Sequence, residues 1–176
     1  MHRIVPSVTT FDQHFQALTE APDVYRPRAC PHCGSAMLWR HGCYHRKADR
    51  GASPRSNPVP ICRYSCPSCS RTCSRLPLCI APRRWYDWTI QQQVLRLLLS
   101  GDAVHRSSRC TGRDRHTVRR WRDWLNQRSQ TFAFHLRSRF PALGRHPDQA
   151  TFWCQVLDSL SLATAMAWLD REIIVP

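Results

Sequence analysis

Two Cys-x-x-Cys pairs constrain this chain more than any other feature. The first lies in CPHCG, residues 30–34, and the second in CPSCS, residues 66–70. A turn of this kind directs two thiolates to one point, and two such turns can complete a tetrahedral site of four sulfurs. If these four cysteines were ordinary buried residues instead, their regular spacing would be a coincidence. The predicted metal ligands are therefore Cys30, Cys33, Cys66 and Cys69.

The segment between the two pairs is long enough for a β-hairpin that carries the second pair at its far end. Strand-like stretches, AMLWRHGCYHRK and VPICRYSC, flank the loop-like ADRGASPRSNP. This is the arrangement of a zinc ribbon. We expect one Zn²⁺, because four thiolates in tetrahedral array suit it, although iron could occupy the same ligands. A ribbon of this size is expected to have little apolar core, so metal binding would supply much of its folding free energy.

Other potential ligands lie in the same part of the chain. Four further cysteines lack the Cys-x-x-Cys spacing: Cys43, Cys62, Cys73 and Cys79. We interpret them as small buried hydrophobes, with a second metal site as the open alternative. Three histidines are predicted to be surface or DNA-facing groups: His32, His41 and His45.

The N-terminal stretch MHRIVPSVTTFDQHF has no apolar core and no small-residue cleavage site of a secretory signal. No apolar run approaches the length of a membrane span. We therefore expect a cytoplasmic protein with no membrane partner, in which paired cysteines bind metal rather than form disulfides.

The formal net charge is +14, and all but one of the 26 basic residues are arginine. Residues 28–126 carry nearly all of the excess positive charge, whereas both ends of the chain are close to neutral. A strongly basic segment predicts an acidic partner, and arginine suits phosphates and guanine edges. Double-stranded DNA is the expected partner.

Hydrophobic periodicity predicts helices outside the cysteine-rich segment. Phe11, Phe15 and Leu18 give residues 9–20 one apolar face. Residues 83–126 and 129–172 also have helical patterns, the latter broken at 141–144 and at Pro147. The expected fold class is α+β. The predicted segments are an arm (1–27), a zinc ribbon (28–80), a helix-turn-helix (81–128) and a helical C-terminal segment (129–176).

A helix-turn-helix is predicted from three features of residues 88–126. A first helix ends at Gly101, a second covers roughly 102–110, and Thr111-Gly112 forms a tight turn. Asp114 can cap a third helix. That helix would bury Val118, Trp121 and Leu125 and expose its basic side chains: Arg115, His116, Arg119, Arg120 and Arg122.

The ribbon sequence, from CPHCGSAMLWRHGCYHRK to CIAPRRWYDWTIQ, resembles the zinc-ribbon region of transposon- and insertion-sequence-encoded proteins. It also resembles a bacterial family of ribbon-plus-helix proteins. GRDRHTVRRWRDWL is similar to the end of transposase helix-turn-helix domains. The resemblance covers about residues 28–126. It implies the four metal ligands named above and DNA-facing positions on the third helix, to which the charge pattern adds Arg83 and Arg84.

The chain departs from the patterns it resembles at three positions. Ser107 and Arg113 stand where such domains bury apolar residues, and Cys73 replaces an aromatic residue after the second pair. These departures concern the packing of the second helix and the strength of DNA binding.

Together these features predict a zinc-dependent DNA-binding protein that acts as an accessory or regulatory factor of a bacterial mobile element. It is expected at the nucleoid. The alternative is a zinc-ribbon scaffold or an RNA-binding module without sequence-specific DNA recognition. No enzymatic activity is expected, because the acids after the ribbon are few and scattered and the chain is short for a recombinase.

The C-terminal segment is apolar at helical spacing, which is more typical of a core than of an interface. A partner recombinase or transposase, or a second copy of the chain, could nevertheless dock at residues 150–172.

Overall fold

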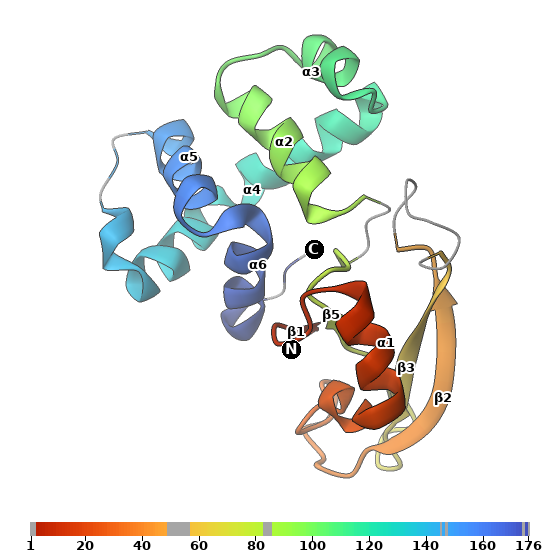
Figure 1. The fold of residues 1–176 in the computed structure, drawn as a ribbon. Helices are drawn as coiled ribbons and strands as arrows, with labels where there is room; N and C mark the ends of the chain where they lie inside the picture. Colours follow the sequence, from red (N-terminus) through yellow and green to blue (C-terminus); the bar gives the residue numbers. More distant parts are fainter. Residues whose placement is uncertain are drawn as a thin grey trace. The chain divides into compact units, whose positions relative to one another are not determined.

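The structure, a computed structural model, has an α+β fold, as predicted. It describes residues 3–48, 57–82, 86–144, 146, 148–173 and 175. The chain forms two compact units (Figure 1). Unit 1 comprises Met1–Asp87 with Ile173–Pro176, and unit 2 comprises Trp88–Glu172. The predicted segment boundaries at residues 27 and 128 fall inside these units rather than between them.

Unit 1 contains the strands and two short helices. In chain order they are β1 (Ile4–Val5), α1 (Phe11–Glu20), the 3₁₀ helix η1 (Pro22–Tyr25), β2 (Trp39–Arg46), β3 (Val59–Ser65), β4 (Thr72–Cys73) and β5 (Leu76–Pro77). β2, β3 and β4 form an antiparallel sheet in that order, and β1 pairs in parallel with β5. The hairpin expected between the two cysteine pairs is therefore confirmed.

The predicted N-terminal helix is confirmed as α1, which begins with a capping box. The Thr10 hydroxyl accepts a hydrogen bond from the Gln13 backbone, and the Gln13 side chain accepts one from the Thr10 backbone. These two bonds satisfy N–H groups that an α-helix leaves without partners at its start. The cap fixes where the chain enters α1, which lies against the hairpin (Figure 1).

A buried histidine joins α1 to the hairpin. His14 is 1% exposed; its Nε2 lies 3.0 Å from the Pro60 carbonyl oxygen, and its Nδ1 lies 2.6 Å from the Tyr25 hydroxyl. Because a carbonyl can only accept, Nε2 donates to Pro60 and Nδ1 accepts from Tyr25. Burial lowers the pKa of His14 despite the hydrogen bond to Pro60, so the ring is neutral in this arrangement.

Unit 1 has more apolar core than the ribbon sequence suggests. One cluster combines Val5, Val8 and Tyr25 with hairpin residues such as Tyr64, and a second surrounds Ile61. The difference arises because residues 3–25, part of the segment interpreted from the sequence as a separate arm, cover one face of the hairpin. A bound metal would therefore not be the sole source of stability in unit 1.

Unit 2 is helical, as predicted. Its elements are α2 (Trp88–Leu99), α3 (Val104–Thr111), α4 (Arg115–Arg139), the 3₁₀ helix η3 (Pro141–Leu143), α5 (Gln149–Ser159) and α6 (Ser161–Glu172). α5 and α6 both pack on α2, and α6 also packs on α4. The core interpretation of the C-terminal apolar residues holds, since Trp153, Val156 and Met166 are each 0% exposed. None of the helices in the described part of the chain combines the length and apolar character needed to cross a bilayer.

Candidate metal centre and nucleic-acid interface

Each cysteine pair lies in a turn with the same backbone geometry; we call residues 30–35 and 66–71 the first and second knuckles. The N–H of Cys30 and of Cys66 donates to the carbonyl oxygen five residues later, at 2.7 and 2.9 Å. The carbonyls of the same two cysteines accept from the N–H of Gly34 and Ser70, both at 2.9 Å. Gly34 and Ser70 are both left-handed, with φ of 77° and 58°. Glycine takes this conformation readily, whereas Ser70 takes it at a cost.

The hairpin brings the two knuckles together. Trp39 pairs with Ser65, so the first knuckle precedes and the second follows the same end of the β2–β3 pair. The Sγ atoms of all four predicted ligands lie within 4.8 Å of one another. This is the sole group of three or more potential ligand residues at such distances among the described residues. The four cysteines can therefore hold one metal ion.

The four sulfurs lie in two close pairs, each within hydrogen-bonding distance. Cys33 and Cys66 have their Sγ atoms 3.6 Å apart, and Cys30 and Cys69 have theirs 3.7 Å apart. Burial opposes ionisation of Cys66, but hydrogen bonds from the Cys69 backbone and the Cys33 thiol outweigh it and lower the pKa of Cys66 to about 6. A backbone hydrogen bond favours the Cys33 thiolate, yet the bond to Cys66 and burial raise its pKa to about 12. Backbone hydrogen bonds likewise outweigh burial and lower the pKa of Cys30.

The four further cysteines do not join this group. Cys62 is 1% exposed, and Cys73 and Cys79 are half-buried against the two cores, as expected for small hydrophobes. The prediction of a buried residue is wrong for Cys43, whose side chain is exposed on β2. The three histidines predicted to lie at the surface are exposed: His32, His41 and His45.

The helix-turn-helix prediction corresponds to α3, a turn, and α4. Gly112 ends α3 with φ of 63°, a left-handed conformation that favours glycine. Asp114 then caps α4, as predicted, by accepting hydrogen bonds from the backbone of His116 at 2.9 Å and of Thr117 at 3.3 Å. The turn and the cap together fix the direction in which α4 leaves α3.

The first turns of α4 have one buried and one basic face. Val118, Trp121 and Leu125 are at most 3% exposed, as predicted. The five basic residues predicted to face outward are exposed: Arg115, His116, Arg119, Arg120 and Arg122. Two further residues predicted to contact DNA, Arg83 and Arg84, lie outside the described residues.

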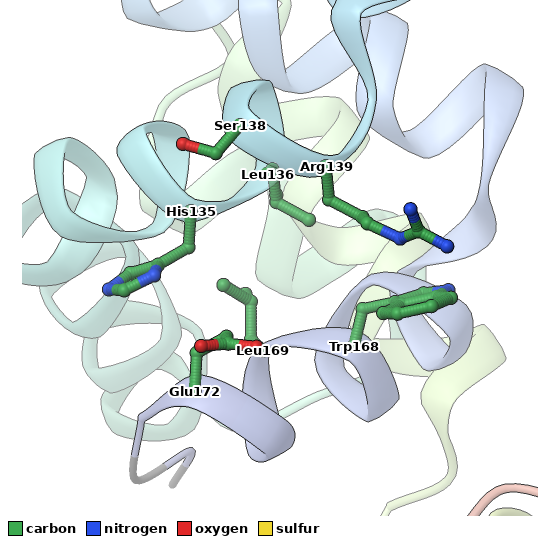
Figure 2. A pocket seen from close by; sticks show the side chains of 7 residues that line it. All are labelled: His135, Leu136, Ser138, Arg139, Trp168, Leu169 and Glu172. Carbon is green, nitrogen blue, oxygen red and sulfur yellow. The ribbon is translucent and has the colours of Figure 1, made fainter.

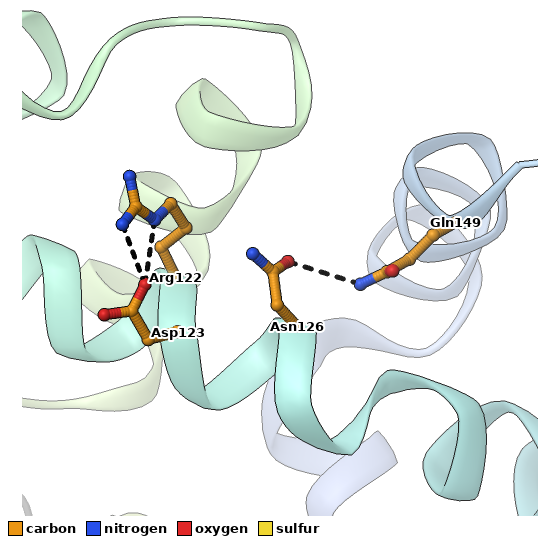
Figure 3. Close-up of polar contacts among 4 residues, drawn as sticks. All are labelled: Arg122, Asp123, Asn126 and Gln149. Atoms are coloured by element: carbon orange, nitrogen blue, oxygen red, sulfur yellow. Dashed lines mark hydrogen bonds and ion pairs between the residues drawn. The ribbon is translucent and has the colours of Figure 1, made fainter.

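One of the exposed arginines is already paired. The Arg122 guanidinium donates two hydrogen bonds to one carboxylate oxygen of Asp123, at 2.8 and 3.0 Å (Figure 3). In the same view, the Gln149 side chain of α5 donates to Asn126 at 3.4 Å. Arg122 therefore offers less net charge to an anionic partner than Arg115 or Arg119.

The structure adds basic residues that the sequence interpretation did not single out. His105, Arg106 and Arg109 are exposed on α3. Arg106 makes an ion pair of 3.4 Å with Asp102. The signal in the sequence was the basic composition of VHRSSRC.

Two exposed apolar residues on the ribbon were also missed. Met37 is 58% and Trp39 is 63% exposed, whereas Leu38 between them is 5% exposed. Alternation around a buried leucine is the strand signal that could have identified them. Next to Trp39, Arg40 and His41 are exposed on the same strand.

The departures at Ser107 and Arg113 are accommodated locally. Ser107 is 0% exposed, and its hydroxyl donates to the Ala103 carbonyl at 3.2 Å, so burial leaves no unsatisfied hydroxyl proton. The Arg113 side chain donates to the Thr111 carbonyl at 2.9 Å and stays at the turn. Neither residue disrupts the α3–α4 packing.

A separate hollow lies between α4 and α6. It has a volume of about 230 Å³, and the Arg139 guanidinium and the Trp168 ring converge at its edge (Figure 2). Arg139 lies 4.7 Å and Arg171 lies 4.0 Å from the centre of that ring, close enough for cation–π contacts. Because small-molecule sites usually exceed about 300 Å³, we assign this hollow a packing role at the end of α4.

A family model described as a domain of unknown function, DUF6431, matches residues 30–121. The match runs from the first cysteine of the candidate metal centre to the second turn of α4. Neither a curated protein nor a solved structure matches the chain.

Proposed function

The chain belongs to the DUF6431 family, and on that premise we propose that it is a zinc-dependent DNA-binding protein. One observation carries the proposal: the exposed basic face at the start of α4, directly after a glycine turn. That placement suits a helix that enters the major groove with its N-terminal turns. The resemblance to transposon-encoded proteins supports a role as an accessory or regulatory factor of a mobile element, acting at the nucleoid.

Arg115 and Arg119 are the proposed base-contacting residues. They lie at i and i+4 on one face of the first two turns of α4, the part of a recognition helix that enters deepest. An arginine there can donate two hydrogen bonds to O6 and N7 of guanine, worth about 1–3 kcal/mol of discrimination per base pair. Arg120 and Arg122 lie further round the helix and are assigned to phosphates.

α3 provides a second row of proposed phosphate contacts. In helix-turn-helix proteins the helix before the recognition helix crosses the DNA backbone. Arg106 and Arg109 are exposed on that helix, so they would bind phosphate on the same DNA segment that α4 enters.

Zinc is the proposed metal. Tetrahedral Zn²⁺ with Zn–S bonds of about 2.3 Å requires sulfurs about 3.8 Å apart. The two close sulfur pairs, at 3.6 and 3.7 Å, support this geometry. Iron remains a rival for four thiolates, and elemental analysis of the purified chain distinguishes the two metals. The metal would hold the two knuckles, and with them Arg40 and His41, in a fixed arrangement for phosphate contacts.

The exposed ribbon residues favour a second candidate function. Met37 and Trp39 form a small apolar surface beside the knuckles, which suits either the stacking of an RNA base or contact with another protein. On this alternative the ribbon is an RNA-binding or scaffolding module, and the α4 arginines select no DNA sequence.

Docking of a recombinase or transposase, or self-association through residues 150–172, stays a prediction. So does the absence of an enzymatic activity.

Site selection from random DNA, followed by titration of variants at several salt concentrations, tests the proposal. Arg115→Ala and Arg119→Ala should relax sequence preference at defined positions of the selected site. Arg128→Ala, an exposed arginine further along α4, is the matched control and should leave preference unchanged. With about six phosphate contacts, affinity should fall by about three orders of magnitude between 50 and 200 mM salt.

Two outcomes would contradict the proposal. Wild-type protein that selects no motif would exclude sequence-specific recognition. Tighter binding to single-stranded RNA than to duplex DNA, lost in Trp39→Ala, would favour the alternative.

A further inference from the structure

Two cysteines outside the metal centre face each other across the hairpin. Cys43 of β2 and Cys62 of β3 are register partners, and their Sγ atoms are 4.0 Å apart. Directly opposed residues of antiparallel strands have Cα atoms about 4.5–5.5 Å apart. That distance lies within the range of about 4.4–6.8 Å that a disulfide bridges. The backbone is therefore already in place for a bond between these two sulfurs.

The two thiols differ in their access to solvent. Cys43 is exposed, whereas Cys62 is 1% exposed within the core that includes Tyr64. Burial is the larger cause and the nearby Cys43 the smaller cause that raise the pKa of Cys62 to about 11. A dissolved reagent can thus reach Cys43, while the sulfur of Cys62 is accessible mainly to its neighbour.

The backbone beside Cys43 is irregular. The β2–β3 register shifts between Arg40 and Cys43, so that two β2 residues oppose one β3 residue. Gly42 has φ of 68°, a conformation that glycine adopts readily. Such a bulge interrupts the ladder next to the cysteine pair, which leaves β2 room for the small shift that shortens 4.0 Å to a bond of about 2.05 Å.

We propose that Cys43 and Cys62 form a dithiol site that exchanges with low-molecular-weight disulfides. The Cys43 thiolate attacks one sulfur of the small disulfide, forms a mixed disulfide and releases one small thiolate. Cys62 then gives its proton to the released small thiolate, attacks Sγ of Cys43 and displaces the second small thiolate, which takes up a proton from water. Two protein thiols are oxidised to one disulfide, and one small disulfide is reduced to two thiols. The site is independent of the proposed DNA binding and uses none of the four metal ligands.

The test uses the full-length chain supplied with Zn²⁺, with oxidised glutathione as the probe. Free thiols are then blocked by alkylation, and peptide mapping by mass spectrometry locates the oxidised cysteines. The expected wild-type product links Cys43 to Cys62 and carries no glutathione on either of these two residues, whatever the exposed Cys110 acquires. Zinc content, measured on the same sample, should not change.

Variants separate the two steps. Cys62→Ala should trap the mixed disulfide, so that one glutathione accumulates on Cys43. Cys43→Ser should give neither the link nor an adduct on Cys62, because Cys62 is buried. Cys79→Ser, at a half-buried cysteine outside the pair, is the matched control and should behave as wild type.

The wild-type map alone can overturn the proposal, even if a variant fails to fold. A map without a Cys43–Cys62 link, or one in which Cys43 is linked to a metal-ligand cysteine instead, would contradict it. So would folded Cys62→Ala protein that acquires no glutathione at Cys43.

Discussion

Asp123 is the one acid among the exposed basic residues at the start of α4, and it binds Arg122 through two hydrogen bonds. Removing its charge should free Arg122 for phosphate. We expect Asp123→Asn to raise affinity for all DNA sequences by about fivefold at moderate salt and to steepen the salt dependence by about one phosphate contact. Titrations of unrelated duplexes at several salt concentrations measure both effects.

A control variant distinguishes the effect of freeing Arg122 from the effect of a change in net charge alone. Asp158 of α5 makes an ion pair of 2.6 Å with Arg96 of α2, and neither residue lies on α3 or α4. Asp158→Asn changes the net charge by the same amount. If it raised DNA affinity as much as Asp123→Asn, the Arg122 pairing would have no particular role in binding.

At the scale of elements, the features predicted correctly from the sequence are those that depend on neighbouring residues. The knuckles, the Asp114 cap and the Gly112 turn each depend on a few neighbouring residues, and all three are present. The packing of α1 against the hairpin, the burial of His14 and the exposure of Trp39 depend on which distant segments cover the hairpin. The spacing of residues along the chain does not determine which distant segments pack together, so these features could not be predicted from the sequence.

The knuckles also predict how metal binding depends on pH. Metal requires four thiolates, but the pKa of Cys33 is raised to about 12. The pKa of Cys69 is also raised, because burial and the hydrogen bond with Cys30 outweigh the backbone hydrogen bond from Arg71. At neutral pH these two groups must lose protons when metal binds, whereas Cys66, with a pKa of about 6, is already ionised. About two to three protons should be released per ion, so the logarithm of the affinity should rise by about two to three per pH unit between pH 7 and 8.

Competition with a chelator of known proton affinity measures this slope. Below pH 6 the slope should steepen further, because Cys66 is then protonated as well. Cys79→Ser should reproduce the wild-type slope. An affinity that does not change with pH would mean that all four thiols are already ionised and would contradict the raised pKa of Cys33 and Cys69.

At the scale of the whole molecule, the two units should lose stability independently. Trp153 is 0% exposed in unit 2; its ring contacts Phe132 of α4, and its Nε1 donates to Ser129 at 2.7 Å. Trp153→Ala should destabilise unit 2 by about 3–5 kcal/mol, because it leaves a cavity and an unpaired hydroxyl. Metal binding in unit 1 should persist.

Denaturant titration followed by circular dichroism, with zinc content measured alongside, checks this expectation. Phe134→Ala is the control on the same helix: Phe134 is 68% exposed and its truncation should cost less than about 0.5 kcal/mol. Loss of zinc in Trp153→Ala would show instead that the two units unfold as one.

The length of α4 has a consequence for how such a chain can diverge. Its 25 residues span about 37 Å as one rod, with a buried stripe from Thr117 to Leu136 and solvent-facing positions between. Folding depends on the buried stripe, whereas the proposed DNA contacts lie on exposed positions of the first turns, so Arg115 and Arg119 can be exchanged without repacking the buried aromatic rings. If the exposed face binds DNA as proposed, chains with this scaffold are free to acquire new target sites while keeping the same fold.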